Sequence, residues 1–291
     1  MSELTATVAT RPGARPVRVG RPAPFSWVGT LPFLGYVGVF LLLPTGIVIW
    51  NGLKGPTGGF SLSGVTSLWG AGTRQIFINS FGLSGITAVI GAVLGAVLAY
   101  AVASGNPDGI VRRLYLSGSG VLAQFGGVTL AFAFLAAIGP TTGFLLRAGW
   151  YYKFPWGIAV IYVYFQVPLM VLVFLPAIDG LKVQWREAAE NLGGSTWHYW
   201  RRIAGPLLAP AFLGATLLLF ANSLSAYATI VAWENQVNYV VPQLISGSMI
   251  SEVGLANPHE ADALALGMVL MVAIVMIGYA LLTRRAARWL R

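Results

Sequence analysis

Six long apolar stretches constrain the fold of this chain more than any other feature of its sequence. An α-helix needs about 20 mostly apolar residues to cross the roughly 30 Å hydrocarbon layer of a membrane. Hydrophobic residues make up 56% of the chain and charged residues only 9%, which leaves too little polar surface for a soluble domain of 291 residues. We therefore predict an all-α polytopic membrane protein. The six predicted transmembrane helices are Leu31–Trp50, Asn79–Ala103, Leu114–Ile138, Trp156–Ile178, Leu207–Ala232 and Leu264–Leu282.

The distribution of Lys and Arg predicts the orientation of these helices, because both residue types are enriched in cytoplasmic loops. With the N-terminal tail placed inside the cell, 14 of the 18 Lys and Arg residues fall on the cytoplasmic side. This asymmetry predicts that both termini are cytoplasmic, and that the segment between the fourth and fifth helices is cytoplasmic as well. The four basic residues on the outer side are Lys54, Arg74, Arg147 and Lys153.

The N-terminal tail differs in composition from the rest of the chain. Residues 1–24 are rich in Pro, Arg, Thr and Ala, and are predicted to form a flexible basic cytoplasmic tail, whereas residues 25–291 form the membrane domain. A net charge of +9 is compatible with nucleic-acid binding, but the basic residues flank apolar segments and do not form a stripe with aromatic stacking partners. We expect contact with membrane lipid and none with nucleic acid.

The cytoplasmic segment 184–206 is predicted to form an elbow of two short helices. Residues 184–192 are mostly good helix formers, and Gly193 with Gly194 supplies positions that stop a helix. Ser195 or Thr196 can then cap a second helix over residues 197–203.

The order Glu187-Ala188-Ala189, three residues, Gly193, nine residues, Ile203 and then Pro206 resembles the cytoplasmic signature of permease subunits of bacterial binding-protein-dependent ABC importers of type I. In that family the first helix docks in a cleft of the ATP-hydrolysing subunit. The resemblance therefore implies that these six residues couple the chain to an ATPase, with small Ala188 and Ala189 permitting close approach and Glu187 offering a carboxylate. The family usually has Leu before the proline, where this chain has Gly205. The alternative is an amphipathic surface helix without a partner.

The resemblance also implies an assembly in the bacterial inner membrane. Its other members would be two ABC ATPase subunits, a solute-binding protein on the outer side, and a second permease subunit, which we expect to be a related heterologous chain. This chain contains no GxxxxGK[ST] phosphate loop, so ATP and Mg²⁺ are expected in the ATPase subunits and no cofactor in this one.

No enzymatic chemistry is predicted for this chain. It has no Cys, no HExxH and no GxSxG sequence, and its two histidines, His198 and His259, lack the spacing of metal ligands. An integral membrane enzyme would need a cluster of such residues at one membrane face, so we expect neither a catalytic nor a metal site.

Polar side chains in the apolar spans are candidates for the solute pathway. Asn222, Ser223, Ser225, Tyr227 and Thr229 interrupt the fifth predicted helix, and Gln166 and Gln124 do the same in the fourth and third. Polar groups at membrane depth usually face protein or a water-filled path. The alternative is that they hydrogen-bond neighbouring helices and touch no solute.

The second predicted helix carries a different signal. Gly91 and Gly95 form a GxxxG pair, which lets another helix approach closely.

The sequence FANSLSAYATIVAW, followed by VVPQLI, looks like the corresponding region of permeases for polyamines, aminophosphonates, thiamine and ferric iron. It lacks the Gly-Gly-Pro that sugar permeases commonly carry after the fifth span. The resemblance favours a small polar or cationic solute such as a polyamine, and a sugar-type permease is the alternative. An ion-coupled secondary carrier would be expected to show intramembrane charges or paired broken helices; no carboxylate or basic residue lies securely within a predicted span.

Overall fold

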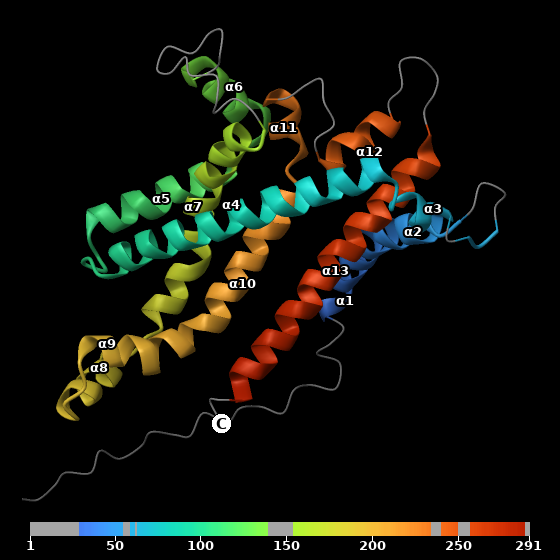
Figure 1. Ribbon diagram of the computed structural model, residues 1–291. Coiled ribbons are helices and arrows are strands. Elements are labelled where there is room, and N and C mark those ends of the chain that lie inside the picture. The colour runs from blue at the N-terminus through green and yellow to red at the C-terminus, as the bar shows by residue number, and fades with distance from the viewer. Residues whose placement is uncertain are drawn as a thin grey trace, which may run out of the picture. The chain divides into compact units, whose positions relative to one another are not determined.

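The described part of the chain is helical. A computed structural model describes residues 29–54, 59–61, 63–138, 154–233, 240–249 and 257–288. Within these ranges the secondary structure consists of helices and one isolated β-bridge between Lys54 and Phe60 (Figure 1). Five of the described helices are long and apolar enough to cross a membrane, and the number becomes six if one bent pair counts as a single span. The predicted all-α polytopic membrane fold is thus confirmed.

The chain divides between Ile47 and Val48 into two compact units. The first helical segment crosses this division and runs from α1 (Leu31–Val37) through a π-helical turn (Gly38–Leu42) to α2 (Leu43–Gly52). It matches the first predicted span to within two residues at its C-terminal end.

Three long helices form the centre of the second unit. They are α4 (Ala71–Ala103), α7 (Trp156–Asp179) and α10 (Gly205–Leu224), and each contacts the other two (Figure 1). Their shared core contains both small and large apolar side chains. Its most deeply buried members are Ala88, Ala92, Ala99, Met170, Val171 and Leu219.

The remaining helices attach to this centre. The long C-terminal helix α13 (Pro258–Arg288) contacts α10, the short helix α3 (Ser63–Ser67) and α12 (Val241–Met249). Helix α5 (Ile110–Gln124) lies along α7, and α6 (Gly127–Ile138) contacts α11 (Tyr227–Trp233).

The glycine pair of α4 brings this helix close to α7. Gly91 and Gly95 are both buried. A Cβ atom at Gly91 would lie 2.8 Å from the Cβ of Gln166, and one at Gly95 would lie 2.8 Å from the carbonyl oxygen of Val167. No side chain fits at either position without a shift of the neighbouring helix, so the predicted close approach is confirmed.

Two predicted spans are broken rather than continuous. The third, Leu114–Ile138, bends by 98° between α5 and α6. Helix α5 ends at Gln124, and Gly127, the first residue of α6, adopts a left-handed φ of +70°, which favours glycine. The fifth, Leu207–Ala232, is interrupted at Ser225 and Ala226, where the Ser225 hydroxyl donates a hydrogen bond of 3.1 Å to the carbonyl oxygen of Asn222.

Candidate functional site

The predicted elbow between the fourth and fifth spans has the expected two helices. They are α8 (Val183–Asn191) and α9 (Thr196–Tyr199). Between them Gly193 adopts a left-handed φ of +77°, and the Gly194 N–H donates to the Ala189 carbonyl at 2.8 Å. The Ser195 hydroxyl accepts the His198 N–H at 3.3 Å and so caps α9, as the sequence predicts.

The six predicted coupling residues do not share one face. Glu187 and Ala188 are exposed, and so are Gly193 and Pro206. Ala189 is instead buried inside the elbow with Tyr199 and Ala204, and Ile203 is half-buried against the same cluster. The small side chain of Ala189 therefore allows α9 to pack on α8 within this chain, while the face available to a partner carries Glu187 and Ala188.

Charge on α8 is partly paired. The Arg186 guanidinium donates to the Glu190 carboxylate at 2.9 Å, one helical turn away, and this hydrogen bond raises the pKa of Arg186 above its usual range. Both side chains remain about half exposed, so the pair adds little to stability. Within the described residues Glu187 forms no ion pair, and its carboxylate is free to meet a basic group.

Three apolar side chains of the elbow are exposed, which the sequence analysis did not anticipate. Val183, Leu192 and Trp197 have 70%, 89% and 72% of their surface exposed. The sequence indicates them only as apolar residues within an otherwise polar segment. Together with Glu187 and Ala188 they give the elbow a surface of mixed apolar and acidic character.

A π-helical turn (Trp200–Ala204) joins this elbow directly to α10. The Gly205 N–H closes the turn by donating to the Trp200 carbonyl oxygen. A Cβ atom at Gly205 would lie 2.6 Å from that oxygen, so a larger residue would force the backbone to move. Gly205, which stands where the family usually has Leu, thus lies directly at the end of the π-helical turn.

Two of the predicted pathway residues belong to a buried network that joins the three central helices. The Gln166 amide of α7 donates to the Thr87 hydroxyl of α4 at 3.2 Å, and this hydroxyl lies 3.1 Å from the Ser223 hydroxyl of α10. None of these three side chains is more than 2% exposed. The Oε1 atom of Gln166 has no hydrogen-bond partner among the described residues. Thr87, the centre of the network, was missed from sequence.

Two more predicted residues hold the segment after the break in the fifth span. The buried Thr229 hydroxyl accepts the Gly127 N–H at 3.0 Å and thereby joins α11 to the start of α6. The Tyr227 hydroxyl lies 2.7 Å from the Ser246 hydroxyl of α12. The helix that follows the second break therefore contacts the first break directly.

Asn222 and Ser225 are placed differently from the others. They line an open cavity of about 400 Å³ together with Gln124 of α5, and Ala123, Leu169, Leu218 and Ala221 complete its wall. The lining is partly polar and carries no charge. Asn222 and Ser225 are thus the predicted pathway residues of the fifth span that line this cavity. Together with Gln124 they give its wall amide and hydroxyl groups.

The described residues contain no group of three or more His, Cys, Asp or Glu side chains that could hold a metal ion.

The paired broken helices were expected of a secondary carrier rather than of a permease, so the comparison with known proteins decides between the two classes. A profile described as "Binding-protein-dependent transport system inner membrane component" matches residues 91–291. The match includes both broken helices and the elbow.

Individual relatives transport different solutes. The sulfate permease protein CysT of Escherichia coli is 30% identical over 28% of this chain and 31% of its own length. The trehalose permease protein SugB of Mycobacterium tuberculosis is 26% identical over 62% of this chain and 59% of its own length. Less than two thirds of either relative is therefore covered. The spermidine/putrescine permease protein PotC of Escherichia coli is 23% identical over 87% of this chain and 92% of its own length.

A solved structure has the same fold. A bacterial ABC transporter involved in the import of the acidic polysaccharide alginate contains a chain that superposes with a TM-score of 0.65 at 18% identity, over 91% of this chain and 95% of that one. This likeness concerns the fold, and the family profile covers well over half of the sequence. The chain belongs to the family of binding-protein-dependent transport system inner membrane components.

Proposed function

We propose that this chain is the permease subunit of an ATP-driven importer of type I, and that its elbow docks on a separate ATPase subunit. The observation that carries the proposal is the elbow itself, where exposed Glu187 and Ala188 stand beside exposed Val183, Leu192 and Trp197. A mixed surface of this kind suits a protein partner that offers a basic group and an apolar cleft.

The proposed assembly follows the family. It contains two ATPase subunits that bind ATP and Mg²⁺, a second permease subunit of related sequence, and a solute-binding protein on the outer side. The distribution of Lys and Arg supports an elbow and two termini in the cytoplasm. Because the sequence has no phosphate-loop motif for ATP hydrolysis, the proposed route for force from ATP is the docked elbow.

The substitution Glu187→Lys tests the docking. It replaces the exposed carboxylate by a cation without touching the buried side of α8, so the chain is expected to reach the membrane in normal amounts. ATP-dependent uptake and stimulation of the ATPase by the solute are expected to be lost. The matched control is Asp108→Lys, which makes the same change in charge at an exposed residue outside the elbow. Normal uptake by the Glu187 variant would overturn the docking role.

The solute pathway is proposed to pass the cavity of Asn222, Ser225 and Gln124. Gln166, Ser223, Thr229 and Tyr227, the other pathway candidates, act in this proposal by fixing the helices that shape it. Their hydrogen bonds within the chain support this packing role, without contact to the solute, for all four residues.

Two substitutions separate the groups. Asn222→Leu removes an amide from the cavity wall, and is expected to raise the KM for uptake with little change in stability. Ser223→Ala removes a hydroxyl from the buried network, and is expected to lower stability with little change in KM. The opposite pattern would assign the pathway to the network instead.

The solute is proposed to be small and polar or cationic, such as a polyamine. The sequence of residues 220–233 and the relative PotC support this class, whereas SugB supports a sugar as the alternative. Uptake of labelled putrescine, trehalose and sulfate by cells that express the whole assembly distinguishes them. Saturable, ATP-dependent uptake of trehalose without uptake of putrescine would overturn the polyamine proposal.

A further inference from the structure

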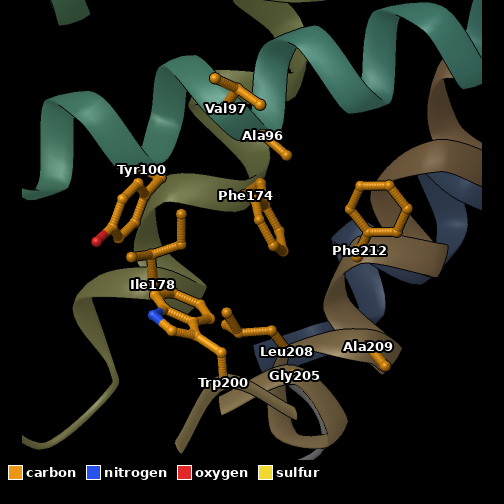
Figure 2. A pocket seen from close by; sticks show the side chains of 10 residues that line it. All are labelled: Ala96, Val97, Tyr100, Phe174, Ile178, Trp200, Gly205, Leu208, Ala209 and Phe212. Carbon is orange, nitrogen blue, oxygen red and sulfur yellow. The ribbon is translucent and has the colours of Figure 1, made fainter. Parts of the chain in front are cut away.

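An apolar cavity of about 550 Å³ lies at the end of the bundle next to the elbow. Figure 2 shows its lining, which comes from α4, from α7, and from the π-helical turn with the start of α10. Aromatic rings dominate this lining: Tyr100 stacks edge-on against Trp200 at 5.2 Å, and Phe174 against Phe212 at 5.7 Å. No charged side chain lines the cavity, and such a lining suits a hydrocarbon chain.

The cavity turns away from the proposed solute pathway. Its residues on α10 are Gly205, Leu208, Ala209 and Phe212, whereas the polar cavity uses Leu218, Ala221 and Asn222 of the same helix. At about 100° per residue the centres of these two groups lie roughly 140° apart around the helix axis. A solute that follows the polar side chains therefore does not enter the aromatic cavity.

The mouth of the cavity has the character of a membrane surface. The Tyr100 hydroxyl and the Trp200 ring nitrogen point to the same side of it (Figure 2). No hydrogen bond joins either group to another described residue, and Val97 and Tyr100 beside it are 62% and 46% exposed. Tyr and Trp place their apolar rings in hydrocarbon and their polar edges at the level of lipid headgroups.

Exposed basic residues follow the lining residue Trp200 in the chain. Arg201 and Arg202 directly follow Trp200, both are exposed, and neither forms an ion pair within the described part of the chain. Cations of this kind next to a membrane attract anionic lipid headgroups.

We propose that the cavity binds one acyl chain of an anionic phospholipid from the leaflet beside the elbow, with its headgroup at Arg201 and Arg202. The bound chain packs between α4 and α10 and against Trp200 of the π-helical turn. The lipid thereby fills the space at the joint between the elbow and the membrane bundle.

Fluorescence quenching by brominated acyl chains tests this site. The full chain, purified with its companion subunits, is reconstituted into vesicles whose phosphatidylglycerol carries brominated acyl chains. The chain has ten tryptophans, so the fluorescence of Trp200 is obtained by subtracting the emission of the Trp200→Phe variant from that of the wild type. We expect this signal to be quenched, and we expect Ala209→Leu, which fills the cavity, to abolish the quenching. Ala96→Leu fills it from α4 and serves as a second filling variant.

The matched control is Ala101→Leu, the same change at an exposed residue of α4 outside the cavity, which is expected to leave the quenching intact. Quenching that persists in both filling variants would overturn the site. Absence of quenching in the wild type, with Ala209→Cys cross-linking to a companion subunit, would assign the cavity to a protein interface and likewise overturn it.

Headgroup selectivity is measured in the same vesicles. Brominated phosphatidylglycerol is expected to quench Trp200 at lower mole fraction than brominated phosphatidylcholine, and the double variant Arg201→Gln, Arg202→Gln is expected to lose this preference. Equal quenching by the two lipids in the wild type would overturn the anionic headgroup site. Neither measurement uses ATP or solute, so a negative result leaves the Glu187 test of the proposed function unaffected.

Discussion

Replacing Gly95 by alanine tests the close contact between α4 and α7. The added methyl group would meet the Cβ of Met170 and would lie 2.7 Å from its Cγ and 2.8 Å from the carbonyl oxygen of Val167. Ordinary contacts are about 3.5–4.0 Å long, so the methyl group and the carbonyl must separate by roughly half an ångström or more. The carbonyl belongs to the backbone of α7 and cannot rotate away, which means that the two helices must move apart.

The free energy of this change has two opposing parts. Alanine is about 1 kcal/mol better than glycine in a helix interior, whereas forcing an extra group into a packed core costs about 1–3 kcal/mol. Gly85 lies on the same helix with no atom within 4 Å of its Cβ position, so Gly85→Ala experiences the first part alone. We therefore expect Gly95→Ala to be less stable than Gly85→Ala by about 1–3 kcal/mol.

Unfolding of the purified chain in mixed micelles, followed by tryptophan fluorescence as denaturing detergent is added, measures this difference. Gly85→Ala is the matched control because it makes the same substitution in the same helix. Equal stability of the two variants would show that α4 and α7 are not held at the distance seen here, and it would refute the argument.

Three further substitutions probe other joints of the bundle. Thr87→Val leaves the buried amide of Gln166 without its acceptor, and is expected to lower the free energy of unfolding by about 1–2 kcal/mol; an unchanged value would contradict the network. Gly205→Leu must displace the π-helical turn, so ATP-dependent uptake is expected to fall at an unchanged amount of protein in the membrane, and full uptake would argue against a requirement for the turn. Arg112→Gln breaks the ion pair with Asp179, whose two side chains are 15% and 39% exposed. The variant is expected to cost about 1 kcal/mol, with a smaller loss at high salt, and a loss that salt does not change would contradict a pair that solvent can screen.

The positions of the spans could be predicted from sequence because they depend on local apolar length. The break in the third span could not, because it depends on a residue that is distant in the chain. Gly127 adopts its left-handed conformation where its N–H meets the Thr229 hydroxyl, about a hundred residues later. Glycine is frequent in membrane helices, so a Gly-Gly pair alone does not distinguish a break from a close helix contact. The third span was therefore predicted as one helix.

The elbow shows the same division. Its two helices, the glycine bend and the Ser195 cap were predictable because caps and stops are local signals. The direction of each side chain was not, because the way α9 folds back on α8 decides which alanine is buried. Ala188 and Ala189 are equivalent in composition, yet only Ala189 lies in the cluster with Tyr199. The likeness to a family signature identifies the segment in the sequence. Which side of α8 is buried and which is exposed depends on the angle at which α9 folds back on it.

Helix α10 links the two halves of the proposed mechanism. It is continuous from the π-helical turn at Gly205 to Leu224, and a helix of 20 residues spans about 30 Å, so its ends lie near opposite sides of a membrane. One end carries the elbow, and the last turns at the other end carry Asn222 and the Ser223 hydroxyl of the buried network. Because a helix bends little except at an interior proline, displacement of the elbow must move the polar end as well, or be absorbed at the π-helical turn or at Pro210. In the proposed function, the turn with its glycine and the aromatic cavity beside it thus lie between the ATPase-docking elbow and the solute pathway.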